Sequence, residues 1–212
     1  MTKEEYKKNF KEHDTIGWKA IDKVVDKVYG KGEPKYHWGS VVRYAHGGDA
    51  PLDGISGYES TKQTEHIHFC TYGFSELYYN EEAVGKDLSG FGFELTFRLQ
   101  AKLPLEEDPI WVALLLQGFA RYIFESGNRF EEYQFLDIQG NLNEQSSICG
   151  FIFVKDTQLE QTDSVHGKVE FLQLFGITRD EIEDIIHQRK TKKEIIDEHR
   201  ENNPYLITDI YR

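Results

Sequence analysis

The sequence predicts an α+β fold in which a mixed or antiparallel sheet packs with a buried central helix and carries further helices near both ends of the chain. Segments with helical periodicity stand at the beginning and at the end, strand-like segments lie between them, and one long apolar helix interrupts the strands. Hydrophobic residues make up 39% and aromatic residues 14% of the 212 residues. This is enough apolar material for one sizeable core, whereas a chain of this length has little room for two independent domains.

Residues 2–30 predict helical structure with a break near residues 14–17. Thr2 and Glu5 have the spacing of a capping box, and apolar residues recur at helical spacing from Trp18 onward. Gly30 is the expected C-cap. We therefore expect residues 1–16 to form a charged helical extension and residues 17–212 to form the main domain.

The first strand candidates follow this helical region. Residues 41–44 predict a short strand, and the glycine-rich segment 46–51 that follows it predicts a loop. Residues 66–78 and 91–99 are rich in aromatic and β-branched residues, which indicates two longer strands. Along 91–99 apolar and polar residues alternate strictly, so its polar residues share one face, either solvated or paired beneath another element. These polar residues are Glu94, Thr96 and Arg98.

The second half of the chain begins with the apolar helix. Residues 110–125 are apolar almost all round, which predicts a helix buried on most of its sides. Further strand candidates lie at 135–138, 148–155 and 169–175, and the wholly apolar second one is typical of a central strand.

Charged helices are expected after the last strand. Thr178 and Glu181 have capping-box spacing, and Thr191 and Glu194 repeat it, so a second helix is expected to begin there. The segment 202–204, Asn-Asn-Pro, predicts the end of that helix.

Charge and composition restrict the function. The chain has 25 Lys and Arg against 37 Asp and Glu, a formal net charge of −12, which disfavours direct binding of nucleic acid. An acidic surface favours encounter with a basic protein such as a nuclease, although solubility alone also explains such a charge. The longest apolar run is too short to cross a bilayer, no signal peptide is recognisable, and Cys70 and Cys149 lack disulfide or zinc spacing. A cytoplasmic protein without membrane association is expected.

No set of residues predicts catalysis. His66 and His68 share one face of a strand with Glu65 beside them, which is a weak start for a metal site because no third ligand has supporting spacing. A half-exposed strand face is the simpler interpretation of this pair. The serine-nucleophile, zinc-protease and phosphate-loop motifs are absent from the sequence. We therefore expect no enzymatic activity, no cofactor and no metal.

From about Gly17 onward, several motifs in consistent order resemble the Suppressor of fused family. They are GWKAID at 17–22, YAHGGDAPLD at 44–53, HFCTYGFSELY at 68–78, SGFGFELTFRL at 89–99, LQGFARYIF at 116–124 and LITD at 206–209. The resemblance implies that residues 17–212 fold like the N-terminal domain of that family and that the activity is protein binding.

In animals, members of the family sequester Gli-type transcription factors, clamping an extended peptide by strand addition between this domain and a C-terminal one. The sequence ends soon after residue 209, so we expect that second domain to be missing. The family's Gli-facing tyrosine matches Tyr122, but its partner aspartate falls near Gln134, a departure that argues against Gli as the partner.

The chain also resembles stand-alone bacterial members, many of them proposed immunity proteins or antitoxins. We therefore expect a non-enzymatic inhibitor that neutralises a basic intracellular toxin, for example a nuclease. The alternatives are a regulatory module that sequesters another intracellular protein, and an enzyme or metal protein built on the two histidines. The expected partner-binding residues are Tyr122, Glu131, Glu132, Tyr133 and Gln134.

Overall fold

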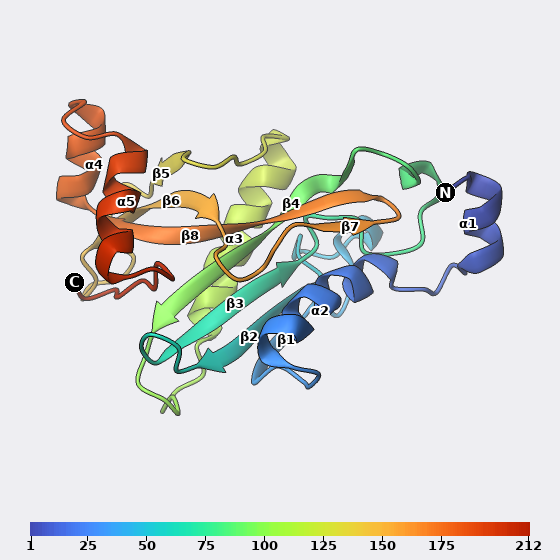
Figure 1. The fold of residues 1–212 in the computed structure, drawn as a ribbon, viewed down its shortest axis with the longest axis horizontal. Coiled ribbons are helices and arrows are strands. Elements are labelled where there is room, and N and C mark those ends of the chain that lie inside the picture. The colour runs from blue at the N-terminus through green and yellow to red at the C-terminus, as the bar shows by residue number, and fades with distance from the viewer.

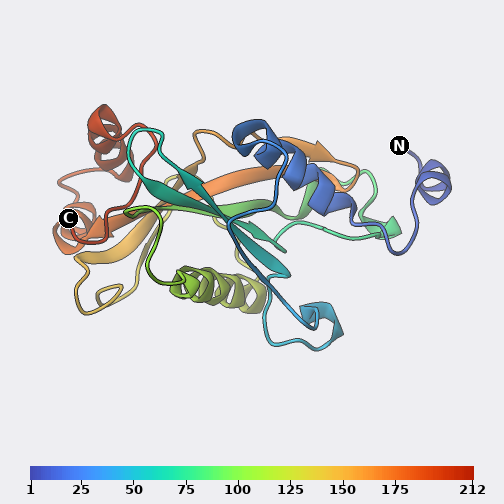
Figure 2. The ribbon, with the colours of Figure 1, turned by 90° about the horizontal axis from the view of Figure 1, so that it is seen from below.

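The computed structural model describes residues 1–212 and arranges helices on both faces of one eight-stranded sheet (Figures 1 and 2). The strands are β1 (Tyr36–Gly39), β2 (Gly54–Ser60), β3 (His66–Tyr72), β4 (Leu88–Gln100), β5 (Phe135–Asp137), β6 (Ile148–Lys155), β7 (Thr162–Ser164) and β8 (Gly167–Thr178). The α-helices are α1 (Lys3–Asn9), α2 (Ile16–Tyr29), α3 (Ile110–Ser126), α4 (Arg179–Ile186) and α5 (Lys192–Asn202). Short 3-10 helices are η1 (Tyr44–His46) and η2 (Glu81–Ala83). The predicted α+β class is confirmed.

The strand order is β1-β2-β3-β4-β8-β6-β5, with β7 paired to β8 outside this path. Every pairing is antiparallel except that of β4 with β8, so the sheet is mixed. The expectation that residues 148–155 form a central strand is wrong in position, because β6 lies next to the edge strand β5. Its apolar sequence instead reflects cover on both faces: Phe151 and Phe153 join one core cluster, whereas Ile152 and Val154 join another.

The largest core cluster lies between the sheet and α3. Alternate residues of β4, such as Phe93 and Phe97, meet the buried side of α3 there, as the alternation predicted. The expectation that this helix is apolar and buried on most sides is too broad. Ile110, Leu114 and Tyr122 are 50%, 66% and 47% exposed, because α3 forms an outer layer with nothing beyond it (Figure 2).

The opposite face of the sheet is covered by α2, which buries Ile21, Val24 and Val25 against β3 and β8. The start of α2 is held tightly, since Gly17 donates its N–H to the Leu77 carbonyl at 2.9 Å. A Cβ at Gly17 would lie 2.1 Å from the Glu76 carbonyl oxygen, so only glycine fits this approach. At the other end of the sheet, α4 and α5 cover a third cluster on β6 and β8.

The N-terminal helix α1 packs on the rest of the chain through Tyr6, which is fully buried. The Tyr6 hydroxyl accepts a hydrogen bond from the Asn80 N–H at 3.0 Å and bonds His166 Nε2 at 2.8 Å. The three predicted capping boxes, at Thr2, Thr178 and Thr191, are all formed. The division of the chain at residue 16 stays a prediction.

One predicted strand is wrong. Residues 41–43 form a bend that leads into η1 at Tyr44, and the neighbouring strand is β1, which pairs with β2. The side chains of Val41 and Val42 are exposed, so these β-branched residues do not pack against a sheet. None of the helices combines the length and the hydropathy that crossing a bilayer requires.

Candidate protein-binding site

The candidate site lies where the sheet ends at β5. This strand pairs with β6 on one side and has no strand on the other, so its outer backbone groups are open to a further strand. Gly127 ends α3 in the left-handed conformation, and the segment 128–134 then leads into β5. The end of α3 and the open edge are therefore neighbours in the fold.

The structure brings Tyr122 and Gln134, two of the predicted binding residues, to the same cavity. Both line an open cavity of about 400 Å³, together with Phe130 and Leu136 among others. The Tyr122 ring stacks on that of Phe130 with ring centroids 6.1 Å apart, which holds one face of the tyrosine and leaves it 47% exposed. An aromatic ring presented in this way is a good anchor for a partner.

The other three predicted binding residues differ in their exposure and contacts. Glu131 is exposed and Glu132 half-buried, and neither forms an ion pair within residues 1–212. Tyr133 is half-buried and packs against the cluster beneath α4 and α5, with its N–H donated to the Phe153 carbonyl at 2.7 Å. Its positive φ of 63° turns the chain at this point.

Sequence reasoning missed several members of the site. Arg129 and Lys192 also line the cavity, so the surface around Tyr122 is mixed in charge and not purely acidic. Phe130 was missed because it lies in an irregular segment, where no periodicity marks a buried aromatic residue. Lys192 comes from α5, 70 positions beyond Tyr122 in the sequence, and only the fold brings it near.

The two histidines lie elsewhere, inside the molecule, so the expectation of a half-exposed strand face is wrong. His66 and His68 are 0% and 1% exposed beneath elements that come from distant parts of the chain. His68 Nδ1 bonds the Tyr29 hydroxyl at 2.7 Å, and Nε2 bonds Asp156 Oδ2 at 3.0 Å. Burial, followed by the nearby Arg98 charge, lowers the pKa of His68 to about 4. The ring is therefore neutral, accepts from Tyr29 and donates to Asp156.

The polar face of β4 is a paired seam and not a solvated surface. Arg98 is 0% exposed and donates to both carboxylate oxygens of Asp156 at 2.9 Å, while Thr96 donates to the same carboxylate at 2.7 Å. Burial alone would raise the pKa of Asp156, but the hydrogen bonds from His68 and Arg98 and the charge of Arg98 hold it well below its ordinary value. This network occupies the nitrogens of His68, and no cluster of three or more potential metal ligands occurs in residues 1–212.

Together the fold and the site define an α+β domain with an open strand edge beside an exposed aromatic side chain, an arrangement that protein-binding modules use. The chain belongs to the Suppressor of fused family: the family model described as "Suppressor of fused protein (SUFU)" matches residues 48–212. In animals this family is a non-enzymatic, protein-binding regulatory one.

Relatives of known sequence support this assignment. The Suppressor of fused homologs of Homo sapiens and Mus musculus are each 35% identical to this chain over 187 residues. The match covers 82% of this chain and 38% of each relative, so the chain spans less than half the length of these curated relatives.

Solved structures agree on the fold. A chain in the crystal structure of the Sufu–Fu complex has a TM-score of 0.82 and 28% identity, covering 93% of this chain and 91% of that one. Drosophila Suppressor of Fused has the same score and identity, covering 95% and 51%. A protein of Neisseria gonorrhoeae FA 1090, described as a homolog, has a TM-score of 0.57 and 17% identity, covering 92% and 96%, and supports the fold alone.

Proposed function

We propose that this chain is a non-enzymatic inhibitor that binds and neutralises an intracellular protein, and specifically that it is an immunity protein or antitoxin against a basic toxin such as a nuclease. The observation that carries the proposal is the open edge of β5 beside the exposed ring of Tyr122. The family assignment supports protein binding in general, and the net charge of −12 supports a basic partner.

The binding would proceed by strand addition. An extended segment of the partner pairs with the free backbone groups of β5, which supplies affinity without demanding a particular sequence. Tyr122 and Phe130 provide an aromatic surface for one side chain of that segment, and Gln134 offers hydrogen bonds at the same cavity. The unpaired carboxylates of Glu131 and Glu132 complement lysines or arginines at the rim of the interface.

A cytoplasmic location is part of the proposal. Cys70 and Cys149 are both free and buried, and neither has a disulfide partner. Such cysteines are typical of a reducing compartment.

Co-expression with the product of the adjacent gene tests the antitoxin proposal. The expected result is that this chain restores growth and that the two chains co-purify in equal amounts. If the neighbour is harmless by itself and no complex forms, the antitoxin proposal is wrong.

The placement of the site has its own test. Glu131→Lys plus Glu132→Lys should weaken the complex by about tenfold or more at low salt, mainly by slowing association. Glu106→Lys plus Glu107→Lys reverses the same number of charges in an exposed loop and should leave binding unchanged. Equal affinities for the two double variants, both folded, would rule out this surface.

A second candidate function is regulation of another intracellular protein by sequestration. The 35% identity to the human homolog and the 0.82 TM-score to a chain of the Sufu–Fu complex favour it. A stoichiometric complex with a protein that is not toxic would support this function over the antitoxin.

A further inference from the structure

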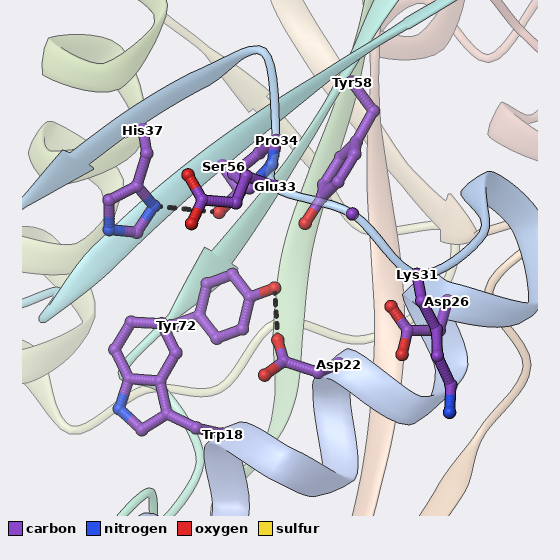
Figure 3. Close-up of a pocket in the computed structure, with 11 residues that line it drawn as sticks. Trp18, Asp22, Asp26, Lys31, Glu33, Pro34, His37, Ser56, Tyr58 and Tyr72 are labelled. Atoms are coloured by element: carbon purple, nitrogen blue, oxygen red, sulfur yellow. Dashed lines mark hydrogen bonds between the residues drawn. The ribbon is translucent and has the colours of Figure 1, made fainter.

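A cavity of about 640 Å³ lies at the other end of the sheet from β5 (Figure 3). It is open to solvent and is lined by α2, by the segment 31–34 that leads to β1, and by β1, β2 and β3. This is the α2 side of the sheet, away from α3. Its aromatic lining consists of Trp18, Tyr58 and Tyr72, and its acidic lining of Asp22, Asp26 and Glu33.

The aromatic rings are fixed before any ligand arrives. Trp18 and Tyr72 stack with centroids 4.3 Å apart and planes 17° from parallel. Gly54 on β2 makes room for the indole, since a Cβ there would lie 2.5 Å from Trp18 Cη2. Tyr58 is held in turn by stacking on Tyr29 at 4.8 Å. Tyr72 is itself buried in this stack, so a ligand would meet the ordered, partly exposed rings of Trp18 and Tyr58 and would not have to order them itself.

The carboxylates of this cavity form no salt bridge, although Lys31 and His37 also belong to its lining. None of Asp22, Asp26 and Glu33 forms a salt bridge within residues 1–212. Asp22 accepts a hydrogen bond from the Tyr72 hydroxyl at 3.0 Å, which aims its carboxylate toward the rings (Figure 3). Asp22 is exposed, so its carboxylate is accessible to a bound cation.

Aromatic faces beside carboxylates are a combination that recognises cations. A guanidinium suits this cavity best, because it is planar, stacks on aromatic rings, binds carboxylates through two N–H groups and is weakly hydrated. We propose that the cavity of Trp18, Tyr58 and Asp22 binds an arginine side chain of a protein partner. This is a second contact surface, separate from the β5 edge, and it does not depend on the placement of the first.

An NMR titration of the ¹⁵N-labelled full chain with acetyl-Gly-Arg-Gly-amide tests the proposal. The Trp18 indole N–H and the backbone amides of residues 22–33 should shift and saturate with the arginine peptide. They should respond more weakly to the same peptide with lysine in place of arginine. They should not respond to the peptide with citrulline in that place, because its side chain has nearly the same shape as that of arginine but no charge.

Matched variants connect this binding to the carboxylates. Asp22→Asn plus Asp26→Asn should raise the Kd by about tenfold or more, whereas Glu106→Gln plus Glu107→Gln, which removes as much charge from an exposed loop, should not change it. Thermal unfolding of both variants checks that they are folded. Absence of saturable shifts, equal Kd values for the two variants, or equal binding of the lysine or citrulline peptide would overturn the assignment.

Discussion

Replacing Asp156 by Asn should strongly destabilise the protein. The Asp156 carboxylate accepts hydrogen bonds from Arg98, His68 and Thr96 at 2.7–3.0 Å, and its Oδ1 also accepts from the backbone N–H groups of Gln158 and Leu159. Asparagine keeps the shape of the side chain but removes the negative charge. Its NH₂ group would also face hydrogen-bond donors, from which it cannot accept. The buried guanidinium of Arg98 would then have no counter-charge.

The expected loss can be estimated from burial. Both side chains of the Arg98–Asp156 pair are 0% exposed, and removing one partner of such a pair typically costs about 3–5 kcal/mol. Domains of this kind have a total stability of about 5–15 kcal/mol, so the loss should be obvious. Urea unfolding should show a lower midpoint with an unchanged m-value.

A surface pair provides the control for this experiment. Asp137 pairs with Arg179 at 2.7 Å, but these side chains are 27% and 41% exposed, so Asp137→Asn should cost only about 0–1 kcal/mol. Equal losses in the two variants would refute the argument that burial makes the Asp156 network important. Arg98→Met plus Asp156→Asn should lose less than the sum of the single variants, because the uncompensated charge is then absent.

Two further predictions concern pH and backbone packing. The folded-state pKa of His68, about 4, lies below its ordinary value of 6.5, so its contribution to stability is complete above about pH 6.5 and is lost as pH falls toward 4. Relative to His68→Gln, the wild type should lose about 3 kcal/mol of stability over this range in urea unfolding. Burial raises the pKa of Glu94 to about 7, but Glu94 is present in both proteins, so its contribution to the pH dependence cancels in that comparison. A pH-independent difference would contradict the neutral buried ring. Gly17→Ala should cost about 1–3 kcal/mol by clashing with Glu76, whereas Gly118→Ala, where a Cβ meets nothing within 4 Å, should stabilise α3 by about 0.4–1 kcal/mol. Thermal unfolding that ranks the two alanine variants the other way round would refute this reasoning.

Much of the candidate site was visible in the sequence only through family resemblance. That resemblance pointed to Tyr122 and Gln134, and the structure places both in one cavity. It could not show that Tyr133 turns toward the core or that Lys192 adds a positive charge beside the site. Those facts depend on how α5 packs over β6 and β8, which local patterns do not encode.

The sequence by itself determined what depends on neighbouring residues: the capping boxes of three helices, the alternation along β4 and the α+β order of elements. These features act over a few positions, so periodicity and capping are sufficient to predict them. Tertiary structure alone decided which polar residues are buried and which surfaces stay open. His68 meets Asp156 across 88 positions, and Trp18 stacks on Tyr72 across 54, because α2 folds over a sheet assembled from distant strands. The sheet order likewise decided that β5 has a free edge, since a strand's own residues do not state whether a neighbour will pair with it.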